Sequence, residues 1–249
     1  MTHKTPPNLT VLPDPGALAQ AAAKRLLARF AEPRDRFAVA LTGGSSPEGL
    51  YRLLATDPYR SQIPWGRVHW FWGDDRFVLQ HDPRSNAGAA RRLFLDRVPV
   101  PAANLHPIPT DAPNEDEAAR RYEAELRAFY GADRLDPARL LFDLVLMGVG
   151  NDGHTASLFP GKPQVDETKH WVVGVPQAGM EPFVPRVSLT FPALASTRDM
   201  LFLVTGGGKR EILRRILAGA DLPAARAHSD GDLVWLVDRH AAPERRDVA

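Results

Sequence analysis

A carboxylate and an imidazole stand two residues apart in a glycine-rich segment of this chain, as Asp152 and His154. They follow a short apolar run at residues 144–147, which is typical of a strand buried on both faces of a sheet. An imidazole beside a carboxylate at a strand end can act as a general base with an orienting partner. We therefore interpret His154 as a candidate base and Asp152 as its orienting residue, with a simple hydrogen-bonded turn as the alternative.

The same segment contains three glycines in the pattern G-x-G-x-x-G, which is also a fingerprint of dinucleotide sites: Gly148, Gly150 and Gly153. Two features count against a nucleotide. Asp152 would bring a carboxylate towards a pyrophosphate, and the His-Thr-Ala that follows Gly153 is unusual where a phosphate-binding helix should begin. The pattern therefore favours a base at a strand end over a nucleotide loop.

The loop at residues 42–46 joins another apolar run to a helix that we expect to begin at Pro47. Its Gly43, Gly44 and Ser45 allow backbone N–H groups to point at one spot, where the amino end of the helix adds a partial positive charge. The sequence thus indicates a phosphate-binding loop, and an ordinary tight turn is equally compatible with the spacing.

Further charged residues follow other apolar runs. Lys209 comes after three glycines, but the segment is not a P-loop because an earlier required glycine is missing; it still suits an anion. Arg186 is either a site cation or an edge-strand charge. Asp74 and Asp75 precede Arg76, and an acidic pair could indicate a metal or a surface turn. No further carboxylates are patterned and no histidine pair has metal spacing, so we expect no metal site.

Strand-like apolar runs alternate with helical segments, which predicts an α/β fold with a mostly parallel, Rossmann-like sheet covered by helices on both faces. The expected strands are residues 37–41, 68–72, 144–147, 171–175, 187–189, 200–204 and 233–237, and the expected helices begin near residues 15, 47, 86, 115 and 209. Because parallel strands end at one edge of a sheet, the loops that follow them should converge. We expect a single domain over residues 1–249, with its core at about 9–237.

The composition is that of an ordinary globular enzyme, with 44% hydrophobic and 24% charged residues. A formal net charge of +1 gives no indication of nucleic acid or a membrane surface as a partner. No apolar run approaches the roughly 18 residues of a membrane span, and the first residues lack an apolar signal core. There is no cysteine, which excludes disulfides and thiolate chemistry. We expect a cytoplasmic protein.

Together these motifs resemble the 6-phosphogluconolactonase family, within the sugar-phosphate isomerase and deaminase superfamily. The resemblance rests on blocks spread over about residues 9–237: LTGGSSPEGLY at 41–51, WGDDRFV at 72–78, SNAG at 85–88, GVGNDGHTASLFP at 148–160, RVSLT at 186–190 and GGGK at 206–209. It implies the fold of that superfamily. It also implies hydrolysis of 6-phospho-glucono-δ-lactone in the oxidative pentose phosphate pathway, without a metal or a cofactor.

The chain departs from the family pattern at Asp75, where a glutamate is common, and at Gly207 and Gly208, where acidic residues are frequent. The shorter carboxylate argues against a direct catalytic role for Asp75. We expect His154, with Asp152, to activate a water molecule while Arg76 stabilises the developing oxyanion. The remaining candidates are substrate contacts, most of them for the phosphate: Gly43, Gly44, Ser45, Lys209, Arg186 and Asp74.

Two alternatives remain open. The amino-sugar-phosphate deaminases of the superfamily share the G-x-G-x-D-G-H core but carry a glutamate where Phe159 stands, and a phenylalanine cannot relay protons. A sugar-phosphate sensor could bind without chemistry, which the pair of Asp152 and His154 argues against. The expected partner is a small sugar-phosphate lactone, and the chain is expected to be a monomer or a weak homodimer.

Overall fold

The computed structural model describes residues 8–243 of the chain. Its larger sheet has six parallel strands in the order β1-β9-β8-β5-β2-β3. These strands are β1 (Leu9–Leu12), β2 (Phe37–Leu41), β3 (Val68–Trp72), β5 (Leu144–Met147), β8 (Asp199–Val204) and β9 (Asp232–Asp238). The predicted α/β fold with a mostly parallel sheet is confirmed.

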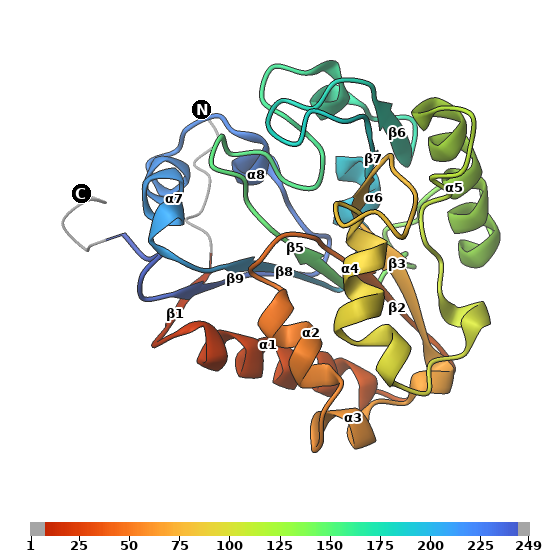
Figure 1. The fold of residues 1–249 in the computed structure, drawn as a ribbon, viewed down its shortest axis with the longest axis horizontal. Helices are drawn as coiled ribbons and strands as arrows, with labels where there is room; N and C mark the ends of the chain where they lie inside the picture. Colours follow the sequence, from red (N-terminus) through yellow and green to blue (C-terminus); the bar gives the residue numbers. More distant parts are fainter. Residues whose placement is uncertain (1–7, 244–249) are drawn as a thin grey trace.

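Helices cover both faces of this sheet, with α1 and α2 on one side and α7 and α8 on the other (Figure 1). The helices are α1 (Pro15–Phe30), α2 (Glu48–Leu54), α3 (Tyr59–Gln62), α4 (Asn86–Leu93), α5 (Glu115–Tyr130), α6 (Phe191–Ala195), α7 (Arg210–Leu217) and α8 (Pro223–Arg226). The predicted helix starts agree to within one residue, because caps and prolines mark them in the sequence. Asp14, for example, accepts a hydrogen bond from the Ala17 N–H ahead of Pro15.

A smaller antiparallel sheet was not predicted. It has the order β4-β7-β6 and consists of β4 (Asp74–Arg76), β6 (Val172–Val175) and β7 (Arg186–Leu189). Residues 171–175 and 187–189 are strands as expected, but they pair here rather than in the parallel sheet. Their short apolar runs carry no information about the direction of the partner strand.

Gly73 links the two sheets. Its N–H donates to the Leu41 carbonyl at the end of β2, at 2.8 Å, and its carbonyl accepts from the Leu189 N–H at the end of β7, also at 2.8 Å. The chain therefore passes from β3 of the parallel sheet into β4 of the antiparallel sheet through a single residue. The end of the parallel sheet and the strands that carry Arg76 and Arg186 are thereby held side by side.

Burial of apolar strands against helices accounts for the fold. All five residues of β2 are buried, as a strand covered on both faces requires. One cluster of buried apolar residues reaches from Leu18 on α1 to Ala241 beyond β9, with Trp70 and Phe142 among its largest members. Within residues 8–243 we find no helix with the length and apolar character needed to cross a bilayer.

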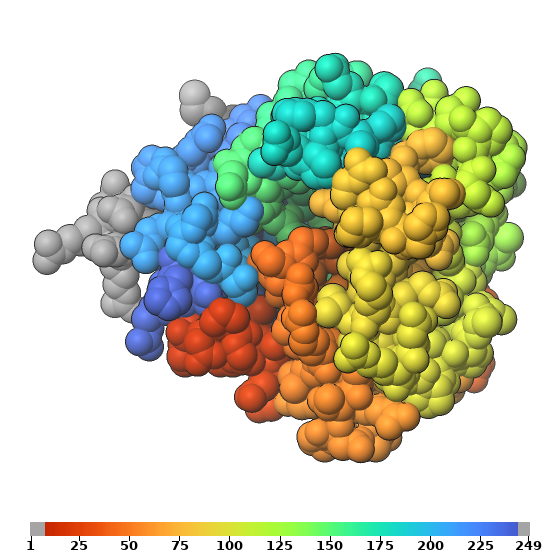
Figure 2. All heavy atoms as spheres, viewed as in Figure 1, coloured from red at the N-terminus to blue at the C-terminus, as the bar shows by residue number. Residues whose placement is uncertain are grey.

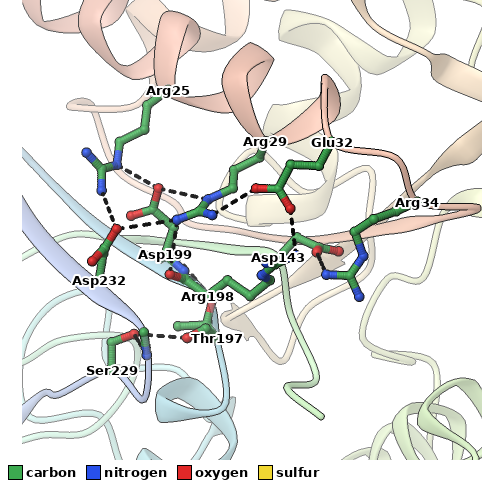
Figure 3. Close-up of polar contacts among 11 residues, drawn as sticks. Arg25, Arg29, Glu32, Arg34, Asp143, Thr197, Arg198, Asp199, Ser229 and Asp232 are labelled. Atoms are coloured by element: carbon green, nitrogen blue, oxygen red, sulfur yellow. Dashed lines mark hydrogen bonds and ion pairs between the residues drawn. The ribbon is translucent and has the colours of Figure 1, made fainter. Parts of the chain in front are cut away.

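At the amino ends of the strands, charged side chains of α1 meet acidic residues that open β8 and β9 (Figure 3). Arg25 and Arg29 both donate from Nε to the buried Asp199 carboxylate, at 2.6 and 3.4 Å. The same two arginines reach Asp232, whose side chain is 66% exposed. Arg25 and Arg29 thus both form ion pairs with carboxylates of β8 and β9, and these ion pairs hold α1 against the sheet.

We predict that Asp199→Asn lowers the free energy of unfolding by about 1–3 kcal/mol, because a buried charge that two guanidinium groups share is lost. Asp232→Asn is the matched control, since it removes an exposed carboxylate from the same arginines and should cost at most about 0.5 kcal/mol. Urea unfolding of the three proteins measures both values. Equal losses in the two variants would contradict the importance of the buried carboxylate.

Candidate active site

A cavity of about 230 Å³ lies where loops from the carboxyl ends of the strands meet. Eight of the nine predicted site residues line this cavity: His154, Arg76, Gly43, Gly44, Ser45, Lys209, Arg186 and Asp74. The ninth, Asp152, lies behind His154 and contacts it. Figure 2 shows the recess between the orange loop after β2, the amber loop after β4, the green loop after β5 and the cyan β6–β7 loop. The expected convergence of the loops is therefore present.

The imidazole of His154 is fixed by its neighbours in the loop after β5. Its Nδ1 lies 2.6 Å from Asp152 Oδ1, and its backbone N–H donates to the same oxygen at 3.1 Å. A Cβ on Gly150 would lie 2.1 Å from Nδ1, so the ring packs directly on that glycine. Gly153 has φ of 88°, a conformation that glycine adopts without strain. The glycines of the motif thus make room for the histidine.

The protonation of this pair follows from its hydrogen bonds. Burial by itself would raise the pKa of the Asp152 carboxyl, but the bonds from His154 and the nearness of the imidazole outweigh it and lower the pKa. An ionised carboxylate can only accept, so His154 Nδ1 is the donor in this hydrogen bond, and in a neutral imidazole bonded in this way Nε2 is the basic atom. An imidazole that a carboxylate orients in this way can act as a general base.

Two guanidinium groups face the same cavity without carboxylate partners. The register of the antiparallel sheet sets Arg76 on β4 directly opposite Arg186 on β7. Their hydrogen bonds go to backbone carbonyls of Arg84 and Pro182, and neither forms an ion pair with a carboxylate of residues 8–243. Within that range the buried Nε atoms of both arginines also lack a hydrogen-bond partner. Like charges opposite each other are destabilising, so this pair suits an anionic ligand.

Burial lowers the pKa values of two cations at the cavity, Arg186 and Lys209. Burial lowers the pKa of the Arg186 guanidinium; the Asp74 carboxylate opposes this effect and Arg76 adds to it. Burial likewise lowers the pKa of Lys209, against the influence of Asp152. Lys209 Nζ donates to Asn151 Oδ1 at 2.7 Å, which holds the ammonium beside the His154 loop. The cavity therefore gathers three cations.

Within residues 8–243, the backbone N–H groups of Gly43, Gly44 and Ser45 in the loop after β2 donate no hydrogen bond. Gly44 has φ of 84°, and a Cβ on Gly43 would lie 2.0 Å from Asn86 Oδ1. Glycine is therefore required at Gly43 by close packing and favoured at Gly44 by conformation. Ser46 is tied to Thr205 after β8, with their hydroxyl oxygens 3.0 Å apart. These contacts give the loop after β2 a fixed place at the cavity wall.

Asp74 and Asp75 point in different directions, as neighbours on a strand do. Asp74 lines the cavity and accepts from the Ser157 hydroxyl at 2.7 Å. Asp75 is buried away from it and accepts at the start of α4 from the Ser85 hydroxyl and the N–H groups of Asn86 and Ala87. This geometry agrees with the doubt about a direct catalytic role for Asp75 and gives that residue a structural role instead.

Other residues at the cavity were not singled out from the sequence. Asn86 and Asn151 lie inside the blocks SNAG and GVGNDGHTASLFP, whereas Met180 and Glu181 come from the β6–β7 loop, which carries no motif. A larger cavity of about 630 Å³ lies between α5 and β6, and none of the predicted residues lines it. Among the described residues no group of three His, Cys, Asp or Glu side chains is placed to hold a metal ion.

Comparison with known proteins gives this site a context. Residues 13–235 match the family model described as glucosamine-6-phosphate isomerases/6-phosphogluconolactonase. The chain belongs to this family. A relative in the family, the 6-phosphogluconolactonase of Synechocystis, is 39% identical over 218 residues, which cover 86% of each chain. The resemblance inferred from the motifs is confirmed, over nearly the range expected.

Solved structures agree with the family assignment. The crystal structure of 6-phosphogluconolactonase from Thermotoga maritima superposes with a TM-score of 0.80 at 31% identity, covering 93% of this chain and 99% of that one. A monomeric glucosamine-6-phosphate deaminase superposes with a TM-score of 0.79 at 22% identity, covering 94% and 98%. The second likeness shows the shared fold alone, so it does not distinguish the two activities.

The surroundings of Asp75 generate a pH-dependent prediction. Burial outweighs the hydrogen bonds to its carboxylate and raises its pKa to about 6. Between about pH 4 and 6 the folded protein then holds a proton that the unfolded chain has lost, so this group stabilises the fold as the pH falls. We predict that the free energy of unfolding of the wild type rises relative to that of Asp75→Asn as the pH falls from 7 to 5. The rise is at most about 1.4 kcal/mol per pH unit.

Urea unfolding at several pH values measures this difference, and Asp111→Asn, at an exposed carboxylate, is the control that should show none. A gap between the wild type and Asp75→Asn that stays constant from pH 7 to 5 would contradict the raised pKa.

Proposed function

We propose that this protein hydrolyses 6-phospho-D-glucono-1,5-lactone to 6-phospho-D-gluconate in the oxidative pentose phosphate pathway. The observation that carries the proposal is one cavity that holds an oriented imidazole next to two guanidinium groups, neither of which forms an ion pair with a carboxylate of residues 8–243. A phosphorylated lactone needs both features, a base for water and cations for the phosphate. The 6-phosphogluconolactonases among the relatives support the choice of substrate.

The phosphate would anchor the far end of the substrate. Lys209 and the backbone of Gly43, Gly44 and Ser45 supply donors, and Arg186 is a second phosphate or hydroxyl contact. Arg76 stands opposite Arg186, so it can reach the reacting end while Arg186 holds the substrate. Remote binding of this kind positions the lactone carbonyl against the attacking water.

The chemical step is ester hydrolysis. Nε2 of His154 takes a proton from water as the water oxygen attacks C1, while Asp152 holds the Nδ1 proton. Arg76 stabilises the negative charge that develops on the carbonyl oxygen. The bond between C1 and the ring oxygen then breaks, and the imidazolium returns its proton to that oxygen. The products are the open-chain acid and a neutral His154.

We further propose that residues 1–249 act as one domain, as a monomer or weak homodimer in the cytoplasm, without metal or cofactor. The deaminase alternative is disfavoured by Phe159, which is 1% exposed and carries no group that transfers protons. A sensor without chemistry would not require the contact between His154 and Asp152.

The deciding experiment is an assay with freshly generated 6-phosphogluconolactone at neutral pH, in which the release of acid is followed. We predict a saturable acceleration over the spontaneous opening of the lactone. Release of ammonium from glucosamine 6-phosphate, tested in parallel, should be absent. Lactone opening at the rate of buffer alone would overturn the proposal, and ammonium release would then favour the deaminase.

His154→Ala and Lys209→Ala should affect different kinetic constants. We predict that His154→Ala lowers kcat by about 10²–10⁴-fold, because the base is lost, whereas Lys209→Ala acts mainly on KM, because an anchor is lost. Controls at exposed positions, His228→Ala and Lys24→Ala, should leave both constants unchanged. Each rate is corrected for spontaneous opening. Unchanged turnover in His154→Ala would remove it as the base, and a normal KM with lost kcat in Lys209→Ala would contradict anchoring.

A further inference from the structure

Phe159 belongs to a small apolar cluster that is separate from the main core. It is 1% exposed and packs with Val175, Ala178 and the partly buried Met180. The cluster joins the loop after β5, which carries His154, to the β6–β7 loop. Because Met180 and Glu181 of that second loop line the cavity, this cluster stands directly behind the site.

The Phe159 ring contacts two of the side chains that line the cavity. The centroid of the Phe159 ring lies 4.6 Å from that of His154, with the two planes inclined by 43°. The guanidinium carbon of Arg186 lies 5.9 Å from the same centroid, within the range of a cation–π contact. The phenyl ring therefore contacts both the candidate base, on the loop after β5, and a candidate phosphate ligand on β7.

The local backbone holds the ring in this position. Ala156 has φ of 47°, a positive value that turns the chain back between His154 and Phe159. Ser157 in the same turn donates from its hydroxyl to Asp74 and from its N–H to the Ser188 hydroxyl. The turn is thereby bonded to both β4 and β7, so the ring is anchored to the strands that carry Arg76 and Arg186.

The opposite loop is shaped to accept the ring. A Cβ on Gly179 would lie 2.8 Å from Phe159 Cδ1, closer than side chains pack. Pro182, three residues further on, accepts the hydrogen bond from Arg186 Nη2 at 2.9 Å. The ring thus contacts Arg186 directly and also supports the loop whose carbonyl binds that arginine.

We propose that Phe159 is a positioning residue that sets the His154 imidazole and the Arg186 guanidinium at their working separation. The inference rests on the proposed function for its kinetic meaning, because only a reaction that needs both groups makes their separation matter. An apolar residue of similar size without a flat ring would fill the space but leave both partners free to tilt. In this proposal Phe159 has a function of its own, in addition to standing where the deaminases carry a glutamate.

The test begins with Phe159→Leu, which we predict lowers kcat and raises KM, each by about tenfold, since both partners lose their support. Phe142→Leu is the matched control, because Phe142 is equally buried but precedes β5 at the other end of the strand. It should lose stability while kcat and KM stay within about twofold of the wild type. If the Phe142→Leu control lost activity to the same degree, the effect would be general destabilisation and the proposal would fail.

Double-mutant cycles separate positioning from loss of structure. In a His154→Ala background, Phe159→Leu should cause no further fall in kcat, because there is no base left to position. In an Arg186→Lys background, Phe159→Leu should not weaken the binding of inorganic phosphate further, because the guanidinium that the ring contacts is already absent. Calorimetry measures this binding. Fully additive losses in both cycles would overturn the proposal. Gly179→Ala, which displaces the ring without removing it, should reproduce the kinetic signature of Phe159→Leu.

A spectroscopic readout is independent of activity. In the wild type, the ring protons of His154 should show a ring-current displacement in ¹H–¹³C NMR spectra, and Phe159→Leu should abolish it. If the wild type failed to hydrolyse the lactone, the proposed function would fall, while the phosphate cycle and the NMR shift would still decide whether Phe159 positions the two groups. A His154 signal unchanged by Phe159→Leu would contradict the contact itself.

Discussion

Two arginines opposite each other in an antiparallel strand pair are the constraint around which this site is built. Arg76 and Arg186 are brought together by the register of β4 and β7, and their carboxylate neighbours do not pair with them within residues 8–243. The cost of holding two like charges near each other is offset by the rest of the fold. Hydrogen bonds to backbone carbonyls hold each guanidinium, and neither forms an ion pair with a carboxylate of residues 8–243. The placement of two guanidinium groups at one wall of the cavity is thus a product of the sheet register.

Arginines have different partners at the two ends of the parallel sheet. At the amino ends of the strands, Arg25 and Arg29 share the buried Asp199, and the ion pairs there hold a helix to the sheet. At the carboxyl ends, the nearby carboxylates are engaged with neutral partners: Asp74 with Ser157 and Asp75 with the start of α4. These two acidic groups therefore order the loops around the cavity, and among residues 8–243 neither forms an ion pair with Arg76 or Arg186.

Much of this arrangement could be predicted from the sequence because it depends on local patterns. The strand ends, the glycines around His154 and the loop at Gly43 and Gly44 are marked by residue types whose conformational reasons are local. The antiparallel sheet was missed because strand direction depends on distant partners, and with it the pairing of Arg76 with Arg186. Met180 and Glu181 were missed for a related reason, since a loop without a motif reaches the cavity only through the fold.

Gly73 has a consequence for how the site meets its ligand. Because the Gly73 N–H bonds to Leu41 of one sheet and the Gly73 carbonyl bonds to Leu189 of the other, the parallel sheet and the sheet that carries the arginines are joined through a single residue. Groups that are held in fixed positions before binding need little rearrangement when a ligand enters. Selectivity would then come from the fixed shape of the cavity, with a substrate whose phosphate and carbonyl are wrongly spaced being rejected by geometry.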